Sequence, residues 1–331
     1  MDAIIAYDLS KQYGSDIALC GVNLEIPQGS IFACVGEEKS GKTTLMRLLA
    51  GLCVPTMGEC TVMGYSPVAE AEKVHAVTGV VLDTASLYED MTLNANLMFT
   101  ASINGIEPND AIDRTSFLLH KLDIWEFREE PVRELPTGAL WRASLARALM
   151  HSPRLLLIDE PAGGVDQESM DAVGQLIRYL VDEEEATVVL STGNLQHAQT
   201  LCGSFAVLKE GSILAKGDLE SLRKGAGLNY QASLRLGEGG EALGGFRLAA
   251  DGRWVKTIAS EEEMPKIIRE AAQQASLYEA AVLKPTLEDI YDAYMNGVTG
   301  EEEAEQDGEE ESEPGFVPED TDDETPGEAE V

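Results

Sequence analysis

A glycine-rich segment near the N-terminus has the residue types and the spacing needed to hold phosphate groups. It follows the apolar run Ser30–Val35 and precedes a helical pattern over Thr43–Ala50. Glycines let backbone N–H groups close around phosphate oxygens, and the N-terminus of the following helix adds positive potential. In such a P-loop, Lys42 reaches the β- and γ-phosphates and the Thr43 hydroxyl ligates Mg²⁺. The segment therefore predicts a nucleoside triphosphate site made of Gly36, Glu37, Glu38, Lys39, Ser40, Gly41, Lys42, Thr43 and Thr44.

Two adjacent acids follow a second apolar run, Leu155–Ile158. A strand that ends in acids places their carboxylates at the carboxyl edge of a sheet, where open α/β sheets bind ligands. In this position Asp159 would hold Mg²⁺ through water, and Glu160 would polarise the attacking water. Together with Lys42, these acids form the catalytic set that we predict for nucleotide hydrolysis.

The elements around these residues alternate between strands and helices. Residues 3–9 and 19–26 are predicted strands, and a helix near 168–185 precedes another apolar strand, Thr187–Ser191. Between the two chemical motifs, residues 92–130 carry large apolar side chains at helical spacing. Apolar strands that alternate with helices indicate an α/β fold with a parallel sheet, here carrying a helical insert.

The pattern changes after about residue 225. Two strand-like segments, Leu228–Leu236 and Phe246–Ile258, surround glycine-rich turns, and a helix, a strand and a last helix follow. We therefore predict three parts: residues 1–225 as the nucleotide-binding domain, with a helical subdomain at about 84–150; residues 226–296 as a small α+β accessory domain; and residues 297–331 as a tail. The tail is rich in Glu, Asp, Gly and Pro, cannot offset its ordering entropy by burial, and is predicted to be disordered.

The amino-acid composition argues against several classes of protein. The chain has 331 residues, 44% of them apolar, which suffices for a sizeable core. Its net charge is −35, so it repels phosphate backbones and we expect no nucleic-acid partner. The 5 cysteines form no Cys-x-x-Cys pair, which argues against a disulfide framework or a zinc site. No signal peptide or membrane-spanning run is visible, so we expect a soluble, cytoplasmic chain.

With these motifs in hand, residues 1–296 resemble the ATP-binding subunits of ABC transporters. The stretch from Leu145 to Pro161 is a close match to the family, and Gly163-Gly-Val-Asp166 is similar to the loop that contacts the opposite subunit. Tyr13 looks like the aromatic residue that stacks on adenine. The segment Leu87–Thr92 resembles the lead into the helical subdomain, and Pro285–Ile290 looks like the last helix of the branch that carries drug-resistance and antibiotic exporters.

The resemblance implies an α/β P-loop NTPase fold of the ABC type, with ATP and Mg²⁺ as ligands. It also implies a second ABC cassette, identical or different, and a separately encoded integral-membrane permease that holds the chain at the inner face of the cell membrane. The further ATP-contacting positions implied are Asp83, Leu135, Thr137, Gly138 and Asp166, with Asp83 also a ligand of Mg²⁺ beside Thr43 and Asp159.

Four positions depart from the family pattern. Asp83 replaces a glutamine, and Leu135-Pro136-Thr137-Gly138 replaces the signature Leu-Ser-Gly-Gly. Gly193 stands where the switch histidine is expected, and Glu37-Glu38-Lys39 replaces Pro-Asn-Gly in the P-loop. Pro136 has neither hydroxyl nor N–H, although it suits the first position of a helix. We therefore predict that ATP hydrolysis is slow. We also expect the Glu37 and Glu38 side chains to point toward solvent.

Three basic residues near these positions are expected to have structural roles and no direct role in catalysis. His197 is expected to be a solvated helix residue, and Arg142 and Arg147 to stabilise the signature helix. Two alternative functions stay open. One is a nucleotide-gated structural or regulatory cassette with little or no ATPase activity. The other is a soluble cassette without a permease, such as a translation or repair factor, although these normally carry two cassettes or a coiled-coil insert.

Overall fold

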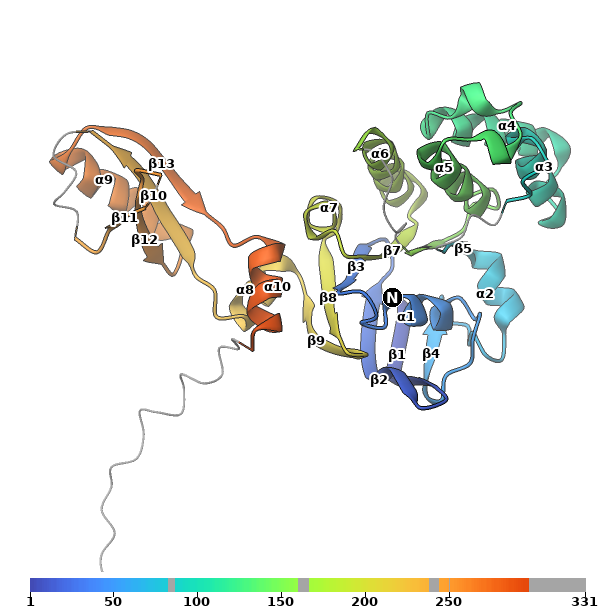
Figure 1. The fold of residues 1–331 in the computed structure, drawn as a ribbon, viewed down its shortest axis with the longest axis horizontal. Helices are drawn as coiled ribbons and strands as arrows, with labels where there is room; N and C mark the ends of the chain where they lie inside the picture. Colours follow the sequence, from blue (N-terminus) through green and yellow to red (C-terminus); the bar gives the residue numbers. More distant parts are fainter. Residues whose placement is uncertain (83–86, 160–166, 238–243, 250, 298–331) are drawn as a thin grey trace, which may run out of the picture. The chain divides into compact units, whose positions relative to one another are not determined.

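In a computed structural model of the chain, the residues that can be described are 1–82, 87–159, 167–237, 244–249 and 251–297 (Figure 1). The predicted tail lies outside this part of the chain, apart from Gly297.

A six-stranded sheet forms the centre of the nucleotide-binding domain, in the order β5-β6-β7-β3-β8-β9. Every neighbouring pair runs parallel except β8 and β9. The apolar runs of the sequence become the inner strands because both of their faces are buried. Because β6, β7 and β3 are parallel neighbours, their carboxyl ends meet at one edge of the sheet. The six strands are β3 (Ile31–Gly36), β5 (Thr78–Val81), β6 (Leu155–Asp159), β7 (Thr187–Thr192), β8 (Ser204–Lys209) and β9 (Ser212–Gly217).

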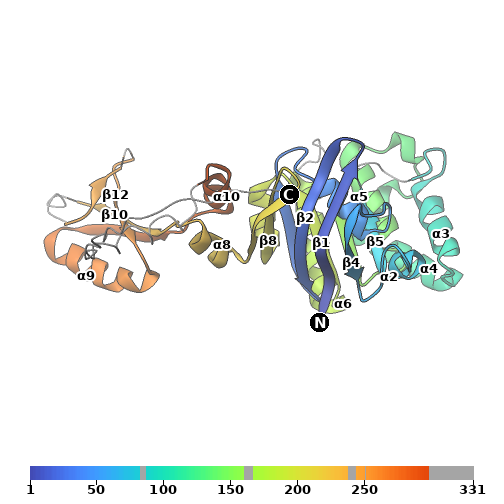
Figure 2. The ribbon, with the colours of Figure 1, turned by 90° about the horizontal axis from the view of Figure 1, so that it is seen from below.

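A second sheet is antiparallel and has three strands in the order β2-β1-β4, with β1 and β2 side by side in Figure 2. Its strands are β1 (Asp2–Tyr13), β2 (Asp16–Pro27) and β4 (Met57–Val62). Helix α1 (Lys42–Leu49) buries Leu45, Met46, Leu48 and Leu49 in a core shared with both sheets. The helix that begins at the P-loop is therefore fixed by apolar contacts on two sides.

The other face of the six-stranded sheet carries most of the remaining helices in one large core. The predicted helical insert is present as α3 and α4, followed by two short 3-10 turns and α5 (Figure 1). The helices on this face are α3 (Leu93–Ile103), α4 (Pro108–Lys121), η1 (Trp125–Phe127), η2 (Val132–Glu134), α5 (Thr137–Ala148), α6 (Gln167–Glu184) and α7 (Leu195–Leu201). Helix α2 (Ala71–Val77) instead buries Val74 in the core that α1 shares with both sheets.

The C-terminal part has a core of its own. A four-stranded antiparallel sheet, ordered β11-β12-β10-β13, is covered on one face by α9. The final helix, α10, instead buries Leu287, Ile290 and Tyr291 in the core of the first domain. The elements are α8 (Leu219–Gly225), β10 (Tyr230–Leu236), β11 (Arg247–Leu248), β12 (Trp254–Ile258), η4 (Glu261–Glu263), α9 (Met264–Gln274), β13 (Leu277–Leu283) and α10 (Leu287–Met295).

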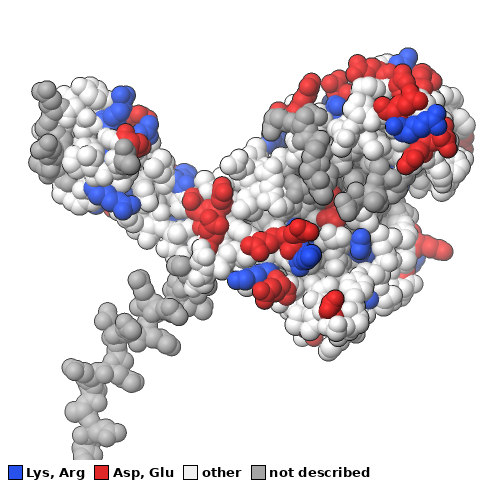
Figure 3. Space-filling model, viewed as in Figure 1, with Lys and Arg blue, Asp and Glu red and all other residues white. Residues whose placement is uncertain are grey.

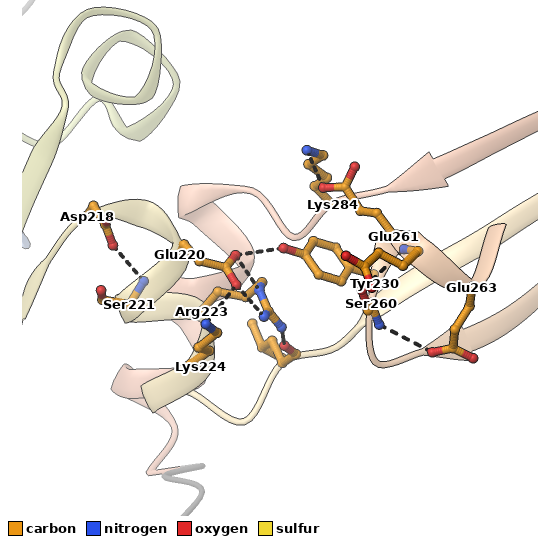
Figure 4. Close-up of polar contacts among 12 residues, drawn as sticks. Asp218, Glu220, Ser221, Arg223, Lys224, Tyr230, Ser260, Glu261, Glu263 and Lys284 are labelled. Atoms are coloured by element: carbon orange, nitrogen blue, oxygen red, sulfur yellow. Dashed lines mark hydrogen bonds and ion pairs between the residues drawn. The ribbon is translucent and has the colours of Figure 1, made fainter. Parts of the chain in front are cut away.

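A polar cluster joins α8 to the first residue of β10 (Figure 4). Glu220 accepts hydrogen bonds from Arg223 and, at 2.7 Å, from the Tyr230 hydroxyl. The Arg223 guanidinium also lies over the Tyr230 ring, 4.2 Å from its centroid. The hydrogen bond from Arg223, followed by that from Tyr230, lowers the pKa of Glu220 to about 2. The sequence analysis did not identify this cluster, because its members come from two elements with no recognisable spacing.

Candidate nucleotide site

The phosphate loop begins where β3 ends, and two of its glycines are required by close contacts. A side-chain carbon at Gly36 would lie 2.5 Å from both the Leu208 carbonyl oxygen and the Ser40 hydroxyl. Gly41 has a φ of +105°, and a carbon there would lie 2.5 Å from the Ala18 carbonyl oxygen. Because no other residue fits these positions without displacing backbone, the glycine spacing sets the shape of the loop.

Lys42 opens helix α1 and its side chain turns back across the loop. Its Nζ donates to the carbonyl oxygens of Gly36 and Glu37, at 2.8 Å each. The ammonium group is thus held inside the ring of loop backbone, where a P-loop lysine meets phosphate oxygens. Thr43 and Thr44 follow in the first turn of α1, both partly buried.

The acids of the loop behave as expected from the sequence. Glu37, Glu38 and Lys39 are exposed, so the carboxylates of this segment face solvent. Lys39 adopts a left-handed backbone with φ of +67° at the tip of the loop. Tyr291 of α10 lies close to the same segment: burial, followed by the charge of Glu37, raises the pKa of Tyr291.

Asp159 is the last residue of β6 and is only 5% exposed. It pairs in register with Ser191 of β7, and the Ser191 hydroxyl donates a hydrogen bond to its Oδ1. Asp83, Glu160 and Asp166, which complete the predicted set of acids, lie outside the described residues. Carboxylate and hydroxyl oxygens are suitable ligands for Mg²⁺, and the Asp159 carboxylate and Thr43 therefore fit that ion.

Gly193, which stands where the family has the switch histidine, follows strand β7 and lies beside the phosphate loop. Thr192 is the register partner of Val35, so Gly193 follows at the same edge as Gly36. A side-chain carbon at Gly193 would meet the Gly36 carbonyl oxygen at 4.0 Å, an ordinary contact distance. Asn194 then caps α7 by accepting a hydrogen bond from the backbone N–H of His197.

His197 is half-buried, which corrects the expectation of a solvated residue. It lines a small apolar pocket together with Trp141, Ile158, Met170 and Leu190. Helices α5 and α6 cover this side of α7, and the sequence pattern of α7 alone could not show that.

The signature segment starts helix α5. The helix begins at Thr137, so Pro136 is its N-cap residue and not its first helical residue, and it supplies no capping side chain. Pro136 and Thr137 are exposed, whereas Leu135 and Gly138 are buried. Arg142 donates to the carbonyl oxygens of Leu122 and Asp123, at 2.9 and 3.1 Å. Arg142 thus ties α5 to the residues that follow α4, which is consistent with the expectation that it stabilises the signature helix.

Tyr13 ends β1 and is 46% exposed. Its hydroxyl lies 3.9 Å from the Cys53 sulfur, and burial followed by that hydrogen bond raises its pKa. The ammonium group of Lys11 lies 4.9 Å from the centre of the Tyr13 ring. The ring is thus accessible for stacking, with a neighbouring cation that the sequence analysis did not anticipate.

Comparison with known proteins agrees with this geometry. Residues 19–163 match the family described as ABC transporter. The bacitracin transport ATP-binding protein BcrA of Bacillus licheniformis is 30% identical over 217 residues, 66% of this chain and 70% of that protein. The daunorubicin resistance ATP-binding protein DrrA3 of Streptomyces coeruleorubidus is 28% identical over 301 residues, 87% of this chain and 94% of that protein.

This chain belongs to the ATP-binding proteins of ABC transporters. The solved ATP-binding subunit of an ABC transporter superposes with a TM-score of 0.64 at 26% identity, over 68% of this chain and 94% of that one. A dimeric ATP-binding cassette in a post-hydrolysis state, bound to ADP and Pi, superposes with a TM-score of 0.60 at 23% identity, over 65% and 98%. The ABC cassette fold and the likeness to drug- and antibiotic-resistance proteins predicted from sequence are confirmed.

For this ABC cassette, the structure brings together the P-loop, Asp159 and the edge that carries Gly193. Two residues near the predicted site were not predicted: Ser191 of β7, which donates a hydrogen bond to Asp159, and Lys11 of β1, beside Tyr13. Ser191 falls in an apolar strand, where its partner depends on strand order and no local signal marks it. Within the described residues, no helix is long and apolar enough to cross a membrane.

Proposed function

We propose that this ABC cassette binds Mg-ATP and couples ATP binding and slow hydrolysis to a separately encoded membrane permease, as part of an exporter. The observation that carries the proposal is the phosphate loop itself, with Lys42 held across it and Asp159 buried at the adjoining strand end. Thr43 and Asp159 would hold Mg²⁺, with Asp83 as the third predicted ligand, and Glu160 would polarise water.

Two such cassettes would bind ATP between them. The exposed Pro136 and Thr137 at the start of α5 would then face the nucleotide of the opposite subunit, with Leu135, Gly138 and the opposite Asp166 completing the contact. Hydrolysis would be slow because Gly193 has no side-chain donor for the γ-phosphate and Pro136 has neither a hydroxyl nor an N–H. The dimeric solved cassette supports this arrangement by its fold.

The permease would dock on the helical insert. Tyr88 is 57% exposed and its ring meets Phe99 edge-on at 5.3 Å, which leaves an aromatic pair at the surface. Leu87 and Met91 are half-buried, so of these three apolar residues before α3 Tyr88 offers the most surface for such a contact. This contact would hold the chain at the cytoplasmic face of the membrane.

The experiment is affinity purification of the tagged full-length chain from detergent-solubilised membranes of its native cells. We expect an integral-membrane subunit to co-purify and the complex to release phosphate from ATP, with Lys42→Ala as the inactive control. Recovery of the chain only from the soluble fraction, with no membrane subunit, would contradict the proposal. A complex that binds ATP but releases phosphate no faster than Lys42→Ala would favour the nucleotide-gated alternative.

A further inference from the structure

Helix α10 places a buried hydroxyl group beside the phosphate loop. Tyr291 is only 9% exposed, and its hydroxyl oxygen is buried without a hydrogen-bond partner among the described residues. The backbone N–H of Glu37 faces this oxygen but does not reach hydrogen-bond geometry. A buried hydroxyl without a partner destabilises a fold, so this group favours an acceptor that can be brought to it.

The Tyr291 hydroxyl is held in place because α10 is fixed at both ends. A capping box closes its first turn, where the backbone N–H of Leu287 also donates to Oε1 of Gln199 at 2.6 Å. At its other end, Nζ of Lys209 donates to the Met295 carbonyl oxygen at 3.1 Å. A new pairing between this hydroxyl and the loop must therefore come from a movement of the loop residue and not of the helix.

The loop that faces this hydroxyl carries acids close to the place where ATP would put its phosphates. Glu37 and Glu38 stand where the family has Pro and Asn, and both are exposed. Like charges at short range repel each other, and more strongly where water is excluded. The rest of the molecule adds to this repulsion, because the chain has 59 acids against 24 Lys and Arg, and Figure 3 shows acidic side chains over several parts of the visible face. Bound ATP therefore favours any arrangement that turns a loop carboxylate away from the phosphates.

Of the two loop acids, Glu37 is the one within reach of Tyr291. Its backbone lies against the hydroxyl, so rotation of the Glu37 side chain alone can bring the carboxylate to that group. The two residues already interact through charge, since burial, followed by the charge of Glu37, raises the pKa of Tyr291. Glu38 does not contribute to this shift.

We propose that Tyr291 is a positioning residue for ATP binding, and that its hydroxyl donates a hydrogen bond to the Glu37 carboxylate when ATP occupies the loop. The bond holds the carboxylate on the α10 side of the loop, away from the phosphate oxygens. A hydroxyl that donates to a carboxylate forms a short and strong hydrogen bond because the acceptor is charged. The last helix of the chain thereby sets the affinity of the loop for ATP. This inference rests on the proposed binding of Mg-ATP.

The test measures Mg-ATP affinity by calorimetry, and the melting temperature without added nucleotide, on the purified full-length chain. Tyr291→Phe removes only the hydroxyl, so it should weaken Mg-ATP binding about tenfold, near the lower limit for a hydrogen bond to a charged group. It should not lower the melting temperature, because the removed oxygen has no partner among the described residues.

Tyr294→Phe is the matched control on the same helix. The Tyr294 hydroxyl donates to the Leu222 carbonyl oxygen at 3.1 Å and is not part of the contact with the loop. Losing this hydrogen bond should lower the melting temperature, while Mg-ATP affinity stays within about twofold of the parent value. The two tyrosine variants should therefore differ in opposite directions in the two measurements.

Two loop variants identify the acid that pairs with Tyr291. Glu37→Ala removes the proposed acceptor, so adding Tyr291→Phe to it should change Mg-ATP affinity by less than about twofold. Glu38→Ala removes the neighbouring charge but keeps the acceptor, so adding Tyr291→Phe to it should still weaken binding about tenfold. The difference between the two double variants measures the coupling of Tyr291 to Glu37, separately from the charge of the loop.

The outcomes distinguish this inference from the proposed function. If Tyr291→Phe binds ATP as the parent does while Lys42→Ala does not, the pairing is refuted and the phosphate site stands. Equal losses from Tyr291→Phe in the Glu37→Ala and Glu38→Ala backgrounds refute Glu37 as the acceptor. A melting temperature that falls as far as in Tyr294→Phe gives Tyr291 a purely structural role and also refutes the inference. A parent chain that binds no Mg-ATP, or binds it no better than Lys42→Ala, overturns both proposals.

Discussion

Restoring a histidine at Gly193 should accelerate ATP hydrolysis. Gly193 follows β7 at the sheet edge, one residue after the register partner of Val35. A side-chain carbon there starts 4.0 Å from the Gly36 carbonyl oxygen, and the φ of Gly193 is outside the left-handed region. A β-carbon therefore costs neither a steric clash nor backbone strain, and an imidazole attached to it begins beside the phosphate loop.

The size of the effect follows from the value of one donor in a transition state. Removing such a donor typically costs about 10²- to 10³-fold in rate, or about 2.7–4 kcal/mol. Pro136 leaves a second defect in place, so Gly193→His should recover only part of this, about tenfold to a hundredfold. Because the donor acts mainly on the transition state, ATP affinity should change by less than about twofold.

The assay is steady-state phosphate release by the purified protein, alone and with its co-purified partners. Gly193→Ala is the matched control, because it adds the β-carbon without a donor and should leave the rate at the parent value. If the parent already turns over at several per second and the histidine adds nothing, the impaired-site hypothesis is wrong. If Gly193→Ala accelerates hydrolysis as much as Gly193→His, the cause is backbone rigidity and not hydrogen bonding.

Lys42→Ala should abolish most phosphate recognition, and equal ATP affinity by calorimetry would refute the site. Of the 5 cysteines, only Cys20 and Cys53 should react with a thiol reagent at pH 8, because the other three are buried and their thiol pKa values are raised to about 11 or 12. Bound ATP should slow the reaction of Cys53, which lies beside Tyr13 at the predicted adenine-stacking position, but not that of Cys20. Glu220 has a pKa lowered from 4.5 to about 2, so it stabilises the fold above pH 4.5, and this contribution is lost as the pH falls toward 2. Glu220→Gln should therefore lower the melting temperature at pH 7 and make the melting temperature depend less on pH between 4.5 and 2. Truncation at Gly300 should leave the melting temperature and ATP affinity unchanged, and a large drop in either would show that the tail contributes to the fold.

The chemical centre of the fold could be predicted because its signals are local. The P-loop has a fixed spacing of glycines, and the structure shows why: a side-chain carbon at Gly36 or Gly41 would lie 2.5 Å from a backbone oxygen. The apolar runs before Gly36 and before Asp159 are short and continuous, which is how strands buried on both faces appear in a sequence. For these residues, the sequence pattern predicts both the secondary structure and the burial of the side chains.

What escaped prediction depends on contacts between distant elements. The partial burial of His197 depends on α5 and α6, which line the same pocket, and the hydrogen bond from Ser191 to Asp159 depends on the order of β6 and β7 in the sheet. Likewise, the sequence indicates a helix at the end of the C-terminal part but not that α10 buries Ile290 and Tyr291 in the core of the first domain. A periodic pattern shows that a face is buried, but it does not name the partner.

The residues that differ from the family pattern are expected to affect the rate of ATP hydrolysis more than the affinity for ATP. The groups that hold the ground-state phosphates, Lys42 and the loop backbone, are intact, and Asp159 is buried with a hydroxyl donor beside it. Two of the four altered positions, Pro136 and Gly193, are those that would act on the γ-phosphate as charge develops. In the proposed function, ATP binding would close the two cassettes and hydrolysis would release them, so slow hydrolysis would lengthen the closed state without weakening its formation. We therefore expect ATP to hold a pair of these cassettes closed for longer than in relatives with an intact signature and switch, and Gly193→His to shorten that lifetime.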